Sequence, residues 1–585
     1  MEQHKKMRLR LFILFILWAT FESMAGELKG SVRDFIGSSP SVSHYEIDGE
    51  NLYSRNVLPM FYLNRMFTPA WIKRDTPFWI NREAPAWTKE KTPVWLYQDV
   101  PAWEPRNVVG KNGYELLDYV RLADQHGLHP TEFHLTLIEN YIGKMVSWKP
   151  MEPEELRNLD ILLTDAFMLL GSQLYFGKVD PAKEGGDWKM ELKDPELRLD
   201  LKLEEALASG DLAGSLDQLA PRYQAYWLMK KQLAFFLGLN EQSWPVISAE
   251  STMRPGDSNP MVPKIRERLV KLRYPLSDTV SMTYDDELEI QLMVFQNDWG
   301  LNSDSLIGKG TLDVLNSRPE KLINKLKVNM ERFRWLPLQV TPKYIIVNIA
   351  NYTLDLIEGT DTLISMRVVV GKDYGKTPVF NERMTYLVFS PTWTVPPTIL
   401  RNEVIPALLK GPGYLKRKHM KILKMDGSEI AYSKINWSKI SRNRFPYMVR
   451  QDPGPLNSLG RVKFIFPNTY NVYIHDTPSK GSFADNNRAL SSGCIRAEKP
   501  YDLAVLLLDD MPEWSPDEIL TAMAQTREQK VVLKTPVDVV LVYLTAWTDG
   551  NSRVQFRKDV YNRDGNVLKA LNRNPGEATE VFIPL

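Results

Sequence analysis

The sequence predicts a multidomain α+β protein, in which a helical domain, a small helical unit and a β-rich domain follow one another. The chain has 585 residues, which corresponds to roughly three or four domains of about 150 residues each. Apolar residues recur at three- and four-residue spacing through residues 104–245, as in amphipathic helices. From residue 343 onward, β-branched and aromatic runs alternate with short turns, as in strands.

The composition and the motifs argue against nucleic-acid binding and against a metal or nucleotide cofactor. The formal net charge is +1, so no overall field attracts nucleic acid or acidic lipid, and we expect no nucleic-acid partner. No His/Asp/Glu cluster has metal-ligand spacing, and no glycine-rich loop is suited to cradle a phosphate. We therefore expect neither a metal nor another cofactor.

Residues 1–25 are predicted to be a signal peptide. Its basic residues are Lys5, Lys6, Arg8 and Arg10. They precede an apolar core of 11 residues at 11–21, which is too short to span a membrane comfortably. Ser23 and Ala25 place small residues where a signal peptidase reads them, which predicts cleavage after Ala25; an uncleaved anchor is the alternative. No other run of about 18 apolar residues occurs, so we expect no membrane association after cleavage.

Residues 26–250 are predicted to form a helical scaffold domain, and residues 68–103 within it carry a tandem octapeptide repeat. The tryptophans of the repeat are Trp71, Trp79, Trp87, Trp95 and Trp103. Each follows a proline by two residues, which excludes one continuous helix. The tryptophans could form a ladder that stacks on sugar rings, or they could pack on the scaffold. We favour packing, because the sequence names no partner for five exposed indoles.

A second helical unit is predicted at residues 261–317, after a polar linker at residues 251–260. It resembles the small three-helix peptidoglycan-binding domain. The residues that carry the resemblance are Phe295-Gln296, Trp299-Gly300-Leu301, Ile307-Gly308, Thr311-Leu312 and Leu315-Asn316. Most of them are core or turn residues, so the resemblance implies the fold more firmly than glycan binding. Residues 318–342 are expected to be a linker.

The β-rich domain is predicted at residues 343–545, with an insert at residues 399–452 and a C-terminal extension at residues 546–585. The insert contains a run of basic residues without a carboxylate: Lys410, Lys416, Arg417, Lys418, Lys421 and Lys424. Such a run is usually a solvated face, but it could also be a lid that attracts an acidic substrate.

Cys494 is the only cysteine of the chain, so it cannot form an internal disulfide. It is either an inert buried residue or a nucleophile. A thiol is only a few per cent ionised near neutral pH, so a nucleophilic cysteine needs an imidazole nearby. His475 ends an apolar strand 19 residues earlier, whereas His419 lies in the basic insert and looks like a surface residue. We expect Cys494 and His475 to meet at hydrogen-bonding distance in an accessible cleft.

The stretch SSGC also supplies candidate donors for an oxyanion. These are the backbone N–H groups of Ser492, Gly493 and Cys494. A glycine directly before the nucleophile allows close approach and unusual backbone angles.

The segments HDTP and SSGCIR, preceded by FSPTWTVPP and PGPLNSLGRVKFIF, resemble the L,D-transpeptidase catalytic domain. The order of parts resembles the large multidomain L,D-transpeptidases of Gram-negative bacteria. The segments LLTDAFMLL, GKVDP and ERFRWLP carry this second resemblance, together with the tail VYLTAWTDG…VQFRKDVYNRD.

The resemblance implies that Cys494 is the nucleophile and His475 the base. It also implies that the backbone carbonyl of Asp476 orients the imidazole, so that the Asp476 side chain matters less. Ser492 stands where the commonest family version has histidine, and its N–H is unaffected.

Three further residues are expected near the substrate. Arg496 either fixes the loop or faces a substrate carboxylate. Trp393 and Tyr473 either line the cleft or belong to the core.

The implied reaction is acyl transfer between peptidoglycan stem peptides, forming 3–3 cross-links. The alternatives are an L,D-carboxypeptidase, a transpeptidase that attaches lipoproteins, and a non-catalytic wall-binding scaffold. The resemblance also implies a periplasmic, wall-associated location and acylation of Cys494 by carbapenems. The expected partners are stem peptides and glycan, with cell-wall synthesis proteins as candidates.

Overall fold

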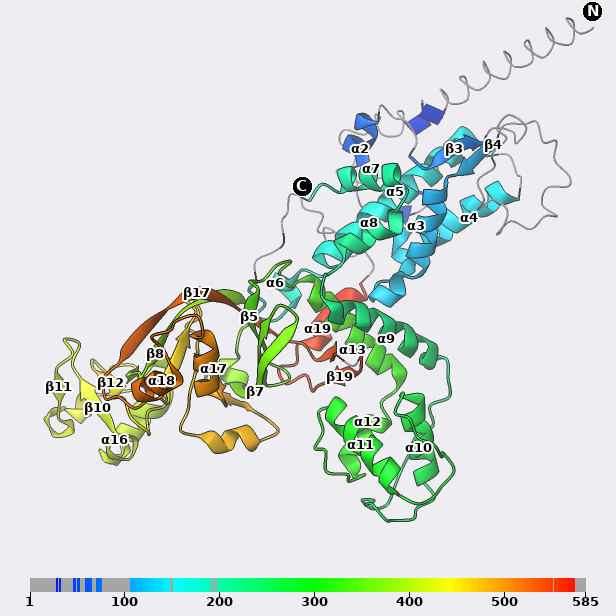
Figure 1. Ribbon diagram of the computed structural model, residues 1–585. Coiled ribbons are helices and arrows are strands. Elements are labelled where there is room, and N and C mark those ends of the chain that lie inside the picture. Colours follow the sequence, from blue (N-terminus) through cyan, green and yellow to red (C-terminus); the bar gives the residue numbers. More distant parts are fainter. Residues whose placement is uncertain are drawn as a thin grey trace, which may run out of the picture.

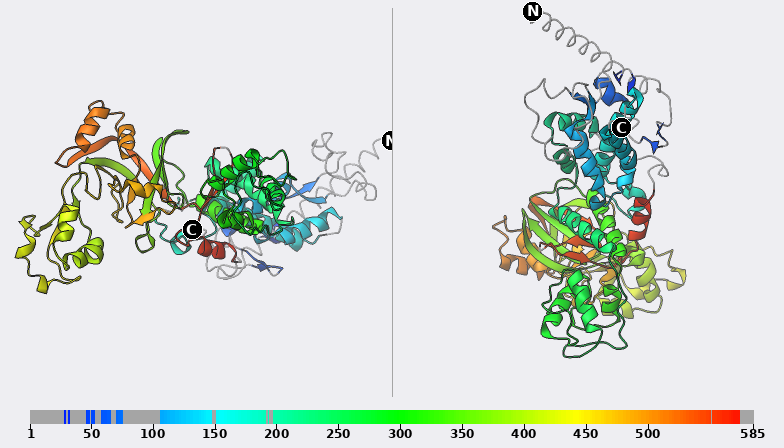
Figure 2. Two further views of the ribbon diagram at one scale, coloured as in Figure 1. Left: turned by 90° about the horizontal axis from the view of Figure 1, so that it is seen from below. Right: turned by 90° about the vertical axis from the view of Figure 1, so that its right-hand side faces the viewer.

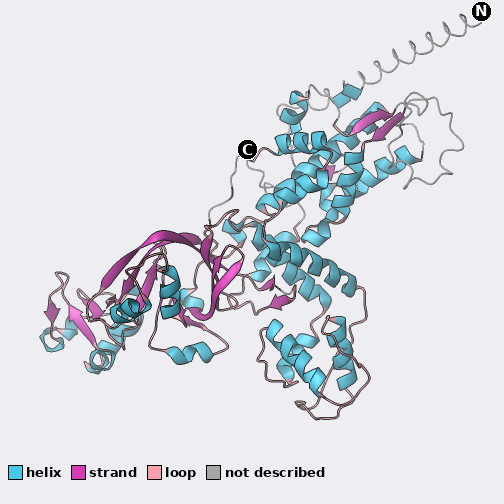
Figure 3. Ribbon diagram, in the orientation of Figure 1, coloured by secondary structure: helices cyan, strands magenta, loops and turns pink. Residues whose placement is uncertain are grey.

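The computed structural model describes residues 106–147, 151–190, 193, 197–550 and 552–573. It also describes residues 28–29, 31–32, 46–48, 50–52, 58–65 and 70–75. The expected signal peptide lies outside these ranges, as does most of the octapeptide repeat. The described chain forms three arms, namely the scaffold, a small helical unit and a β-rich domain, whose far end carries the insert (Figures 1 and 2). Figure 3 shows helices dominating the first two arms and strands the third.

The long helix α5 (Pro153–Phe176) is the centre of the scaffold domain. It begins with a proline, and the Glu155 carboxylate accepts the N–H of Glu152 at 3.1 Å, which caps its first turn. Within the described residues it is the one helix long and apolar enough to cross a membrane. Its apolar window is entirely buried among the other scaffold helices, and a core helix of a folded domain meets the same criterion.

Shorter elements complete this helical part of the chain. The helices are α2 (Leu58–Asn64), α3 (Lys111–Arg121), α4 (Leu135–Val146), α6 (Pro181–Glu184), α7 (Leu199–Ser209), α8 (Leu212–Leu219) and α9 (Gln224–Asn240). Of these, α3, α4, α7 and α8 pack directly on α5. Two antiparallel strand pairs, which the helical pattern did not predict, are β1 (Glu46–Ile47) with β2 (Glu50–Asn51) and β3 (Ile72–Asp75) with β4 (Arg106–Val109).

Trp71 is the described tryptophan of the octapeptide repeat, and it is buried against α5. Its indole N–H donates to Thr164 Oγ1 at 2.9 Å, and its backbone N–H donates to the Asp160 carboxylate at 2.7 Å. This first indole therefore packs on the scaffold. The other four lie outside the described residues.

The small unit contains the three expected helices, α10 (Val262–Lys271), α11 (Asp286–Asp298) and α12 (Lys309–Leu315). Its beginning differs from the expectation. The backbone of Ile247 exchanges two hydrogen bonds with the Asn316 side chain, and Met253 forms a β-bridge with Ile307. The segment expected as a linker at 251–260 thus belongs to the unit, because its backbone groups are paired there.

The prediction of a linker at residues 318–342 is wrong, because helix α13 (Pro319–Arg334) occupies most of this segment. Its buried apolar side chains include Leu322, Ile323, Leu326, Met330 and Phe333. They repeat at helical spacing and pack against α9, so α13 is a buried element that joins the arms.

The β-rich domain is built on a nine-stranded sheet with the order β15-β7-β16-β14-β13-β8-β17-β5-β6. Its strands are β5 (Lys343–Asn348), β6 (Thr353–Glu358), β7 (Asp361–Gly371), β8 (Asn381–Phe389), β13 (Val462–Ile465), β14 (Ile474–His475), β15 (Ala489–Ser491), β16 (Ile495–Ala497) and β17 (Gln529–Val542). Because β6 also pairs with β7, the sheet closes on itself as a barrel. Two helices, α17 (Pro500–Leu507) and α18 (Pro516–Met523), follow β16.

The insert is a separate small unit with its own sheet, in the order β11-β10-β12-β9. Its strands are β9 (Trp393–Thr394), β10 (Met420–Leu423), β11 (Glu429–Ile430) and β12 (Met448–Gln451), and its helices are α14 (Pro397–Ile399), α15 (Ile405–Leu408) and α16 (Gly413–Lys418). It begins earlier than the expected residue 399, because Trp393 pairs with Gln451 rather than with a barrel strand.

The buried apolar residues of the insert form a cluster separate from the one that runs through the rest of the described molecule. Five of its six expected basic side chains are exposed, and Lys421 pairs with Asp452 at 2.5 Å.

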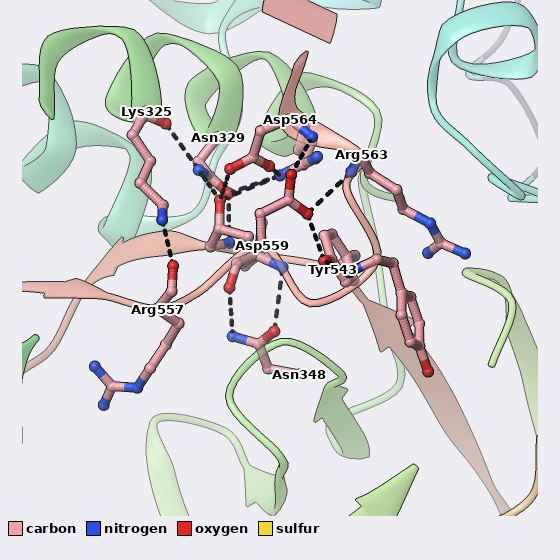
Figure 4. Close-up of polar contacts among 12 residues, drawn as sticks. Lys325, Asn329, Asn348, Tyr543, Arg557, Asp559, Arg563 and Asp564 are labelled. Atoms are coloured by element: carbon pink, nitrogen blue, oxygen red, sulfur yellow. Dashed lines mark hydrogen bonds and ion pairs between the residues drawn. The ribbon is translucent and has the colours of Figure 1, made fainter. Parts of the chain in front are cut away.

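The C-terminal segment is not a peripheral extension. It forms β18 (Ala546–Thr548), β19 (Val554–Phe556) and α19 (Asp564–Leu571), which lie where the three arms meet (Figure 1). β18 packs on α9, α19 packs on α13, and the Phe556 ring lies 4.5 Å from that of Trp299 in the small unit. Figure 4 shows Lys325 of α13 donating to the backbone carbonyl of Arg557 in this segment. Asn329 Nδ2 also donates to Thr545 Oγ1 at 2.9 Å, and Arg332 forms an ion pair with Asp564.

Candidate active site

Cys494 directly precedes strand β16, and the residue is half-buried. The N–H of Ile495 donates to the carbonyl of Tyr473 at 3.0 Å, and the buried Ile495 side chain packs in the apolar core. The Cys494 thiol donates to the carbonyl of Asn471, at an Sγ–O distance of 3.6 Å. A carbonyl oxygen can only accept, so this contact favours the protonated thiol.

His475 ends strand β14 and is only 5% exposed. Its Nδ1 lies 2.5 Å from the backbone carbonyl of Asp476. A carbonyl oxygen can only accept, so Nδ1 carries the imidazole proton and Nε2 is free to act as a base.

The sequence predicts a hydrogen bond between the Cys494 thiol and the His475 imidazole. The described part of the structure does not contain one. Strands β14 and β16 are parallel, and His475 pairs directly with Arg496, so Cys494 is its diagonal neighbour. Two residues of strand rise and one strand spacing put the Cα atoms of His475 and Cys494 about 8 Å apart. The sulfur is turned towards Asn471 instead, and contact with Nε2 needs a rotation about the Cys494 side chain. Catalytic hydrogen bonds are often loose in a site without substrate.

The electrostatics of the pair favour two neutral groups. Burial, with the Arg496 cation as a second cause, lowers the pKa of His475 to about 4. Burial also raises the pKa of the Cys494 thiol, although hydrogen bonds from Tyr473 and the charge of Arg496 oppose this. The resting pair is therefore thiol and imidazole, not the thiolate–imidazolium pair that catalytic cysteines often form. A neutral imidazole can accept the proton as the sulfur attacks.

The Asp476 side chain, which the resemblance implies is less critical, is tightly held. Its carboxylate accepts the backbone N–H groups of Arg461 at 2.8 Å and Thr477 at 2.7 Å, and the Lys480 ammonium at 2.7 Å. Gly460 lies against it with φ +62°, and a Cβ there would stand 2.3 Å from the carboxylate carbon. These contacts fix the residue whose carbonyl orients His475. A glycine in the stretch SLGR was the available sequence signal.

The expectation that Gly493 donates to an oxyanion is also corrected. Its N–H donates to Ser491 Oγ at 3.1 Å, and that hydroxyl donates to the Cys494 carbonyl at 2.6 Å. The N–H groups of Ser492 and Cys494 have no hydrogen-bond partner among the described residues. They remain the candidate donors of this loop, in which Gly493 adopts φ +123°.

The three expected substrate-binding residues lie in different places. Tyr473 lies beside the site, with its ring centroid 5.7 Å from that of His475. Trp393 lies in the sheet of the insert and packs against its core. The Arg496 Nε is buried without a hydrogen-bond partner in the described part of the chain. Glu403 of the insert acts electrostatically on Arg496, opposing the fall in its pKa that burial causes.

One site residue was missed at the sequence level. Asn471, whose carbonyl accepts the thiol proton, has φ +57°. The asparagine in NTYNV was the signal, because asparagine tolerates this left-handed conformation.

The chain was compared with known proteins. Residues 342–539 match the YkuD family, described as the L,D-transpeptidase catalytic domain, and residues 96–233 match a family described as the Scaffold domain. A Haemophilus influenzae protein provisionally named L,D-transpeptidase is 33% identical over 251 residues. That match covers 43% of this chain and 50% of the relative, so the chain spans about half of the relative's length.

Two solved structures were also found. An L,D-transpeptidase from Xylanimonas cellulosilytica aligns at 13% identity over 50% of this chain and 99% of that one, with a TM-score of 0.16. A fused Zn-dependent amidase/peptidase with a peptidoglycan-binding domain, from Clostridium acetobutylicum, aligns at 9% identity over the same shares, with a TM-score of 0.14. Scores this low do not bear on the fold.

The family match spans the barrel, the insert and both segments that carry Cys494 and His475. It ends before β18, which leaves the C-terminal segment outside it. Residues 342–539 are therefore an L,D-transpeptidase catalytic domain, carried on the same chain as a Scaffold domain.

Proposed function

We propose that this protein is a peptidoglycan L,D-transpeptidase that forms 3–3 cross-links, with Cys494 as nucleophile and His475 as base. The observation that carries the proposal is the strand pair β14–β16. It brings the thiol, a buried neutral imidazole and the Arg496 cation together within a domain that matches the L,D-transpeptidase family.

In the first half-reaction, the Cys494 sulfur attacks the carbonyl carbon of the third stem residue, diaminopimelate, in a tetrapeptide donor. His475 Nε2 takes the thiol proton as the S–C bond forms. The C–N bond to the terminal D-alanine then breaks, and the imidazolium returns the proton to the leaving amine. The product is a thioester on Cys494. The free N–H groups of Ser492 and Cys494 are suited to stabilise the oxyanion.

In the second half-reaction, the side-chain amine of an acceptor diaminopimelate attacks the thioester carbonyl. His475 accepts the amine proton, the C–S bond breaks, and the sulfur leaves as thiolate and regains the proton. Water in place of the amine would give a tripeptide and no cross-link.

Arg496 and the insert are proposed to bind the acidic stems. The Arg496 Nε has no partner in the described structure, so a donor carboxylate can pair with the guanidinium. The exposed lysines of the insert are also positively charged and would attract the same acidic groups. We propose that the insert covers the donor and excludes water, which favours the amine as acceptor.

The same proposal includes secretion through residues 1–25 and a periplasmic, wall-associated location. It also includes acylation of Cys494 by carbapenems, binding of the small unit to glycan, and association with other cell-wall synthesis proteins.

The test is incubation of the purified protein with tetrapeptide-containing muropeptides, followed by mass spectrometry. We expect D-alanine release and 3–3 dimers, both abolished in Cys494→Ala. Tripeptides without dimers would identify an L,D-carboxypeptidase instead. Full activity of Cys494→Ala would contradict the assignment of the nucleophile.

A further inference from the structure

The buried hydroxyl of Thr377 binds the nucleophile loop, residues 491–494. Thr377 is fully buried, and its Oγ1 donates to the carbonyl of Gly493 at 2.8 Å while accepting the N–H of Gly371 at 2.9 Å. Gly371 ends strand β7. The next residue, Lys372, donates its N–H to the backbone carbonyl of Ser491 at 3.0 Å. The end of β7 and the loop 491–494 are thus joined on both sides of Gly493.

This contact sets the direction of a group that the reaction needs. The peptide unit between Gly493 and Cys494 is trans and planar, so its carbonyl and its N–H point in opposite directions. Thr377 holds the carbonyl on the inner side, and the Cys494 N–H is therefore directed away from Thr377. A glycine with φ +123° offers little resistance of its own to rotation of this unit, so the external contact decides it.

Tyr561, from the C-terminal segment, completes the arrangement. Its hydroxyl donates to the carbonyl of Gly371 and accepts the N–H of Thr377 at 3.3 Å. The side chain is 2% exposed, and its ring stacks on Tyr543 with centroids 5.5 Å apart. Tyr561 lies beyond the end of the family match at residue 539, so it reaches the catalytic domain from outside it.

The C-terminal turn that carries Tyr561 is itself fixed. Asp559 accepts the Tyr543 hydroxyl at 2.6 Å and the N–H of Arg563 at 2.9 Å, as Figure 4 shows. The Arg563 guanidinium pairs with Asp187 of the scaffold at 3.2 Å. Asp187 also accepts, through its carbonyl, the N–H of Val379, two residues after Thr377. The scaffold and the C-terminal segment therefore meet at residues 371–379.

We propose that Thr377 is a positioning residue that directs the Cys494 N–H towards the oxyanion, and that Tyr561 holds Thr377 in place. This inference rests on the proposed function, because it assumes that Cys494 forms an acyl intermediate. It assigns a catalytic consequence to a C-terminal segment outside the catalytic domain.

The test compares two reactions of Cys494 in the full chain. Acetylation by p-nitrophenyl acetate passes through an oxyanion, whereas alkylation by iodoacetamide does not. In Thr377→Val we expect acetylation to fall by about 10- to 100-fold, with alkylation within about twofold of wild type. Thr377→Ser keeps the hydroxyl and should restore acetylation. Tyr561→Phe should lower acetylation by a smaller factor, because Thr377 keeps its own two contacts. Both rates are read by intact mass.

The small unit supplies matched controls. Thr311→Val and Tyr284→Phe each remove a buried hydroxyl that donates to a backbone carbonyl, at 2.9 and 2.7 Å, far from Cys494 in the chain. They should change neither rate.

Three results would overturn the inference: unchanged acetylation in Thr377→Val, an equal fall of both rates, or no rescue by Thr377→Ser. The proposed function fails separately, if wild type is acetylated but gives no product from muropeptides.

Discussion

The nucleophile loop and the insert both lie near Arg496, the loop through Cys494 and the insert through Glu403, yet they are built differently. The loop 491–494 is bound by hydrogen bonds to residues 371–377 and lies on a barrel whose core continues into the scaffold and the small unit. The insert has its own apolar core and its own four-stranded sheet.

The difference separates two tasks. Bond making needs groups held to a fraction of an ångström, which a shared core and buried hydrogen bonds provide. Selecting an acceptor or excluding water needs a part that can adjust to substrate. Under the proposed function, the first task falls to the barrel and the second to the insert, whose apolar core is separate from that of the barrel.

The largest effect is expected at the base. His475→Ala should lower kcat on muropeptides by about 10²- to 10⁴-fold, because it removes the base that is proposed to take the thiol proton. The measurement is the rate of dimer formation by mass spectrometry. His129→Ala, on the scaffold, serves as the matched control and should leave the rate unchanged. Equal rates in wild type and His475→Ala would show that His475 is not the base of the reaction.

Arg496→Met should change the pH profile. With the pKa of His475 at about 4, the imidazole is neutral at mildly acidic pH, so we expect activity to persist there. Removing the cation raises this pKa, so the acidic limb of kcat/KM moves to higher pH. It also raises the thiol pKa, so the midpoint of iodoacetamide alkylation moves up as well. Arg367→Met, which removes an arginine paired with Glu498, is the control. An unmoved acidic limb would show that Arg496 does not act on the imidazole.

The same pKa shift has a consequence for stability. His475 takes up a proton near pH 6.5 in the unfolded chain but only near pH 4 in the folded one. The free energy of unfolding should therefore fall as pH drops through this window, by about 3 kcal/mol from this group. In Arg496→Met this loss should be smaller, which denaturant unfolding at the two pH values can measure.

Asp476→Ala should cost about 1–3 kcal/mol of stability, since it leaves the buried N–H of Thr477 and the part-buried N–H of Arg461 without an acceptor. Activity should fall by about tenfold, because the carbonyl that orients His475 loses its anchor. Lys480→Met removes only the half-exposed partner of this carboxylate and should cost about 0–1 kcal/mol. Thermal unfolding and kcat are the readouts. Identical losses in both variants would assign the stability to the ion pair instead.

The smallest effect on chemistry is expected from the insert. Leu408 is fully buried in the insert core, and Leu408→Ala should destabilise the insert by about 2–5 kcal/mol. Alkylation of Cys494 should stay within about twofold of wild type, while the ratio of tripeptide to dimer rises. Leu387→Ala makes the same change in the core of the barrel and should lower both reactions. A fall in alkylation in Leu408→Ala would show that the two regions are coupled.

Replacing the exposed lysines Lys416, Lys418 and Lys424 by glutamine tests the charge of the insert without touching its core. If these lysines attract the acidic stems, KM rises and kcat changes little. An unchanged KM would leave them as a solvated face.

The sequence anticipated those parts whose signal is local. Helices α5 and α9 follow from apolar spacing, and strands β5 to β8 follow from β-branched runs. Helix α13 was missed, because its apolar residues are interleaved with lysine, asparagine and arginine and its partner α9 lies far back in the chain. The Gly493 N–H was misassigned for a related reason, because the Ser491 hydroxyl that accepts it has no sequence signature.

Residue chemistry alone pointed to Cys494 and His475, because a single thiol needs an imidazole and few histidines were available. It also pointed to the order of the three arms, which follows from periodicity. Packing settled the rest: the diagonal register of His475 and Cys494, the neutral state of both, and the contact between Tyr561 and the β7 end. Register, burial and contacts between residues 184 positions apart depend on where distant segments fold together, and no local pattern encodes that.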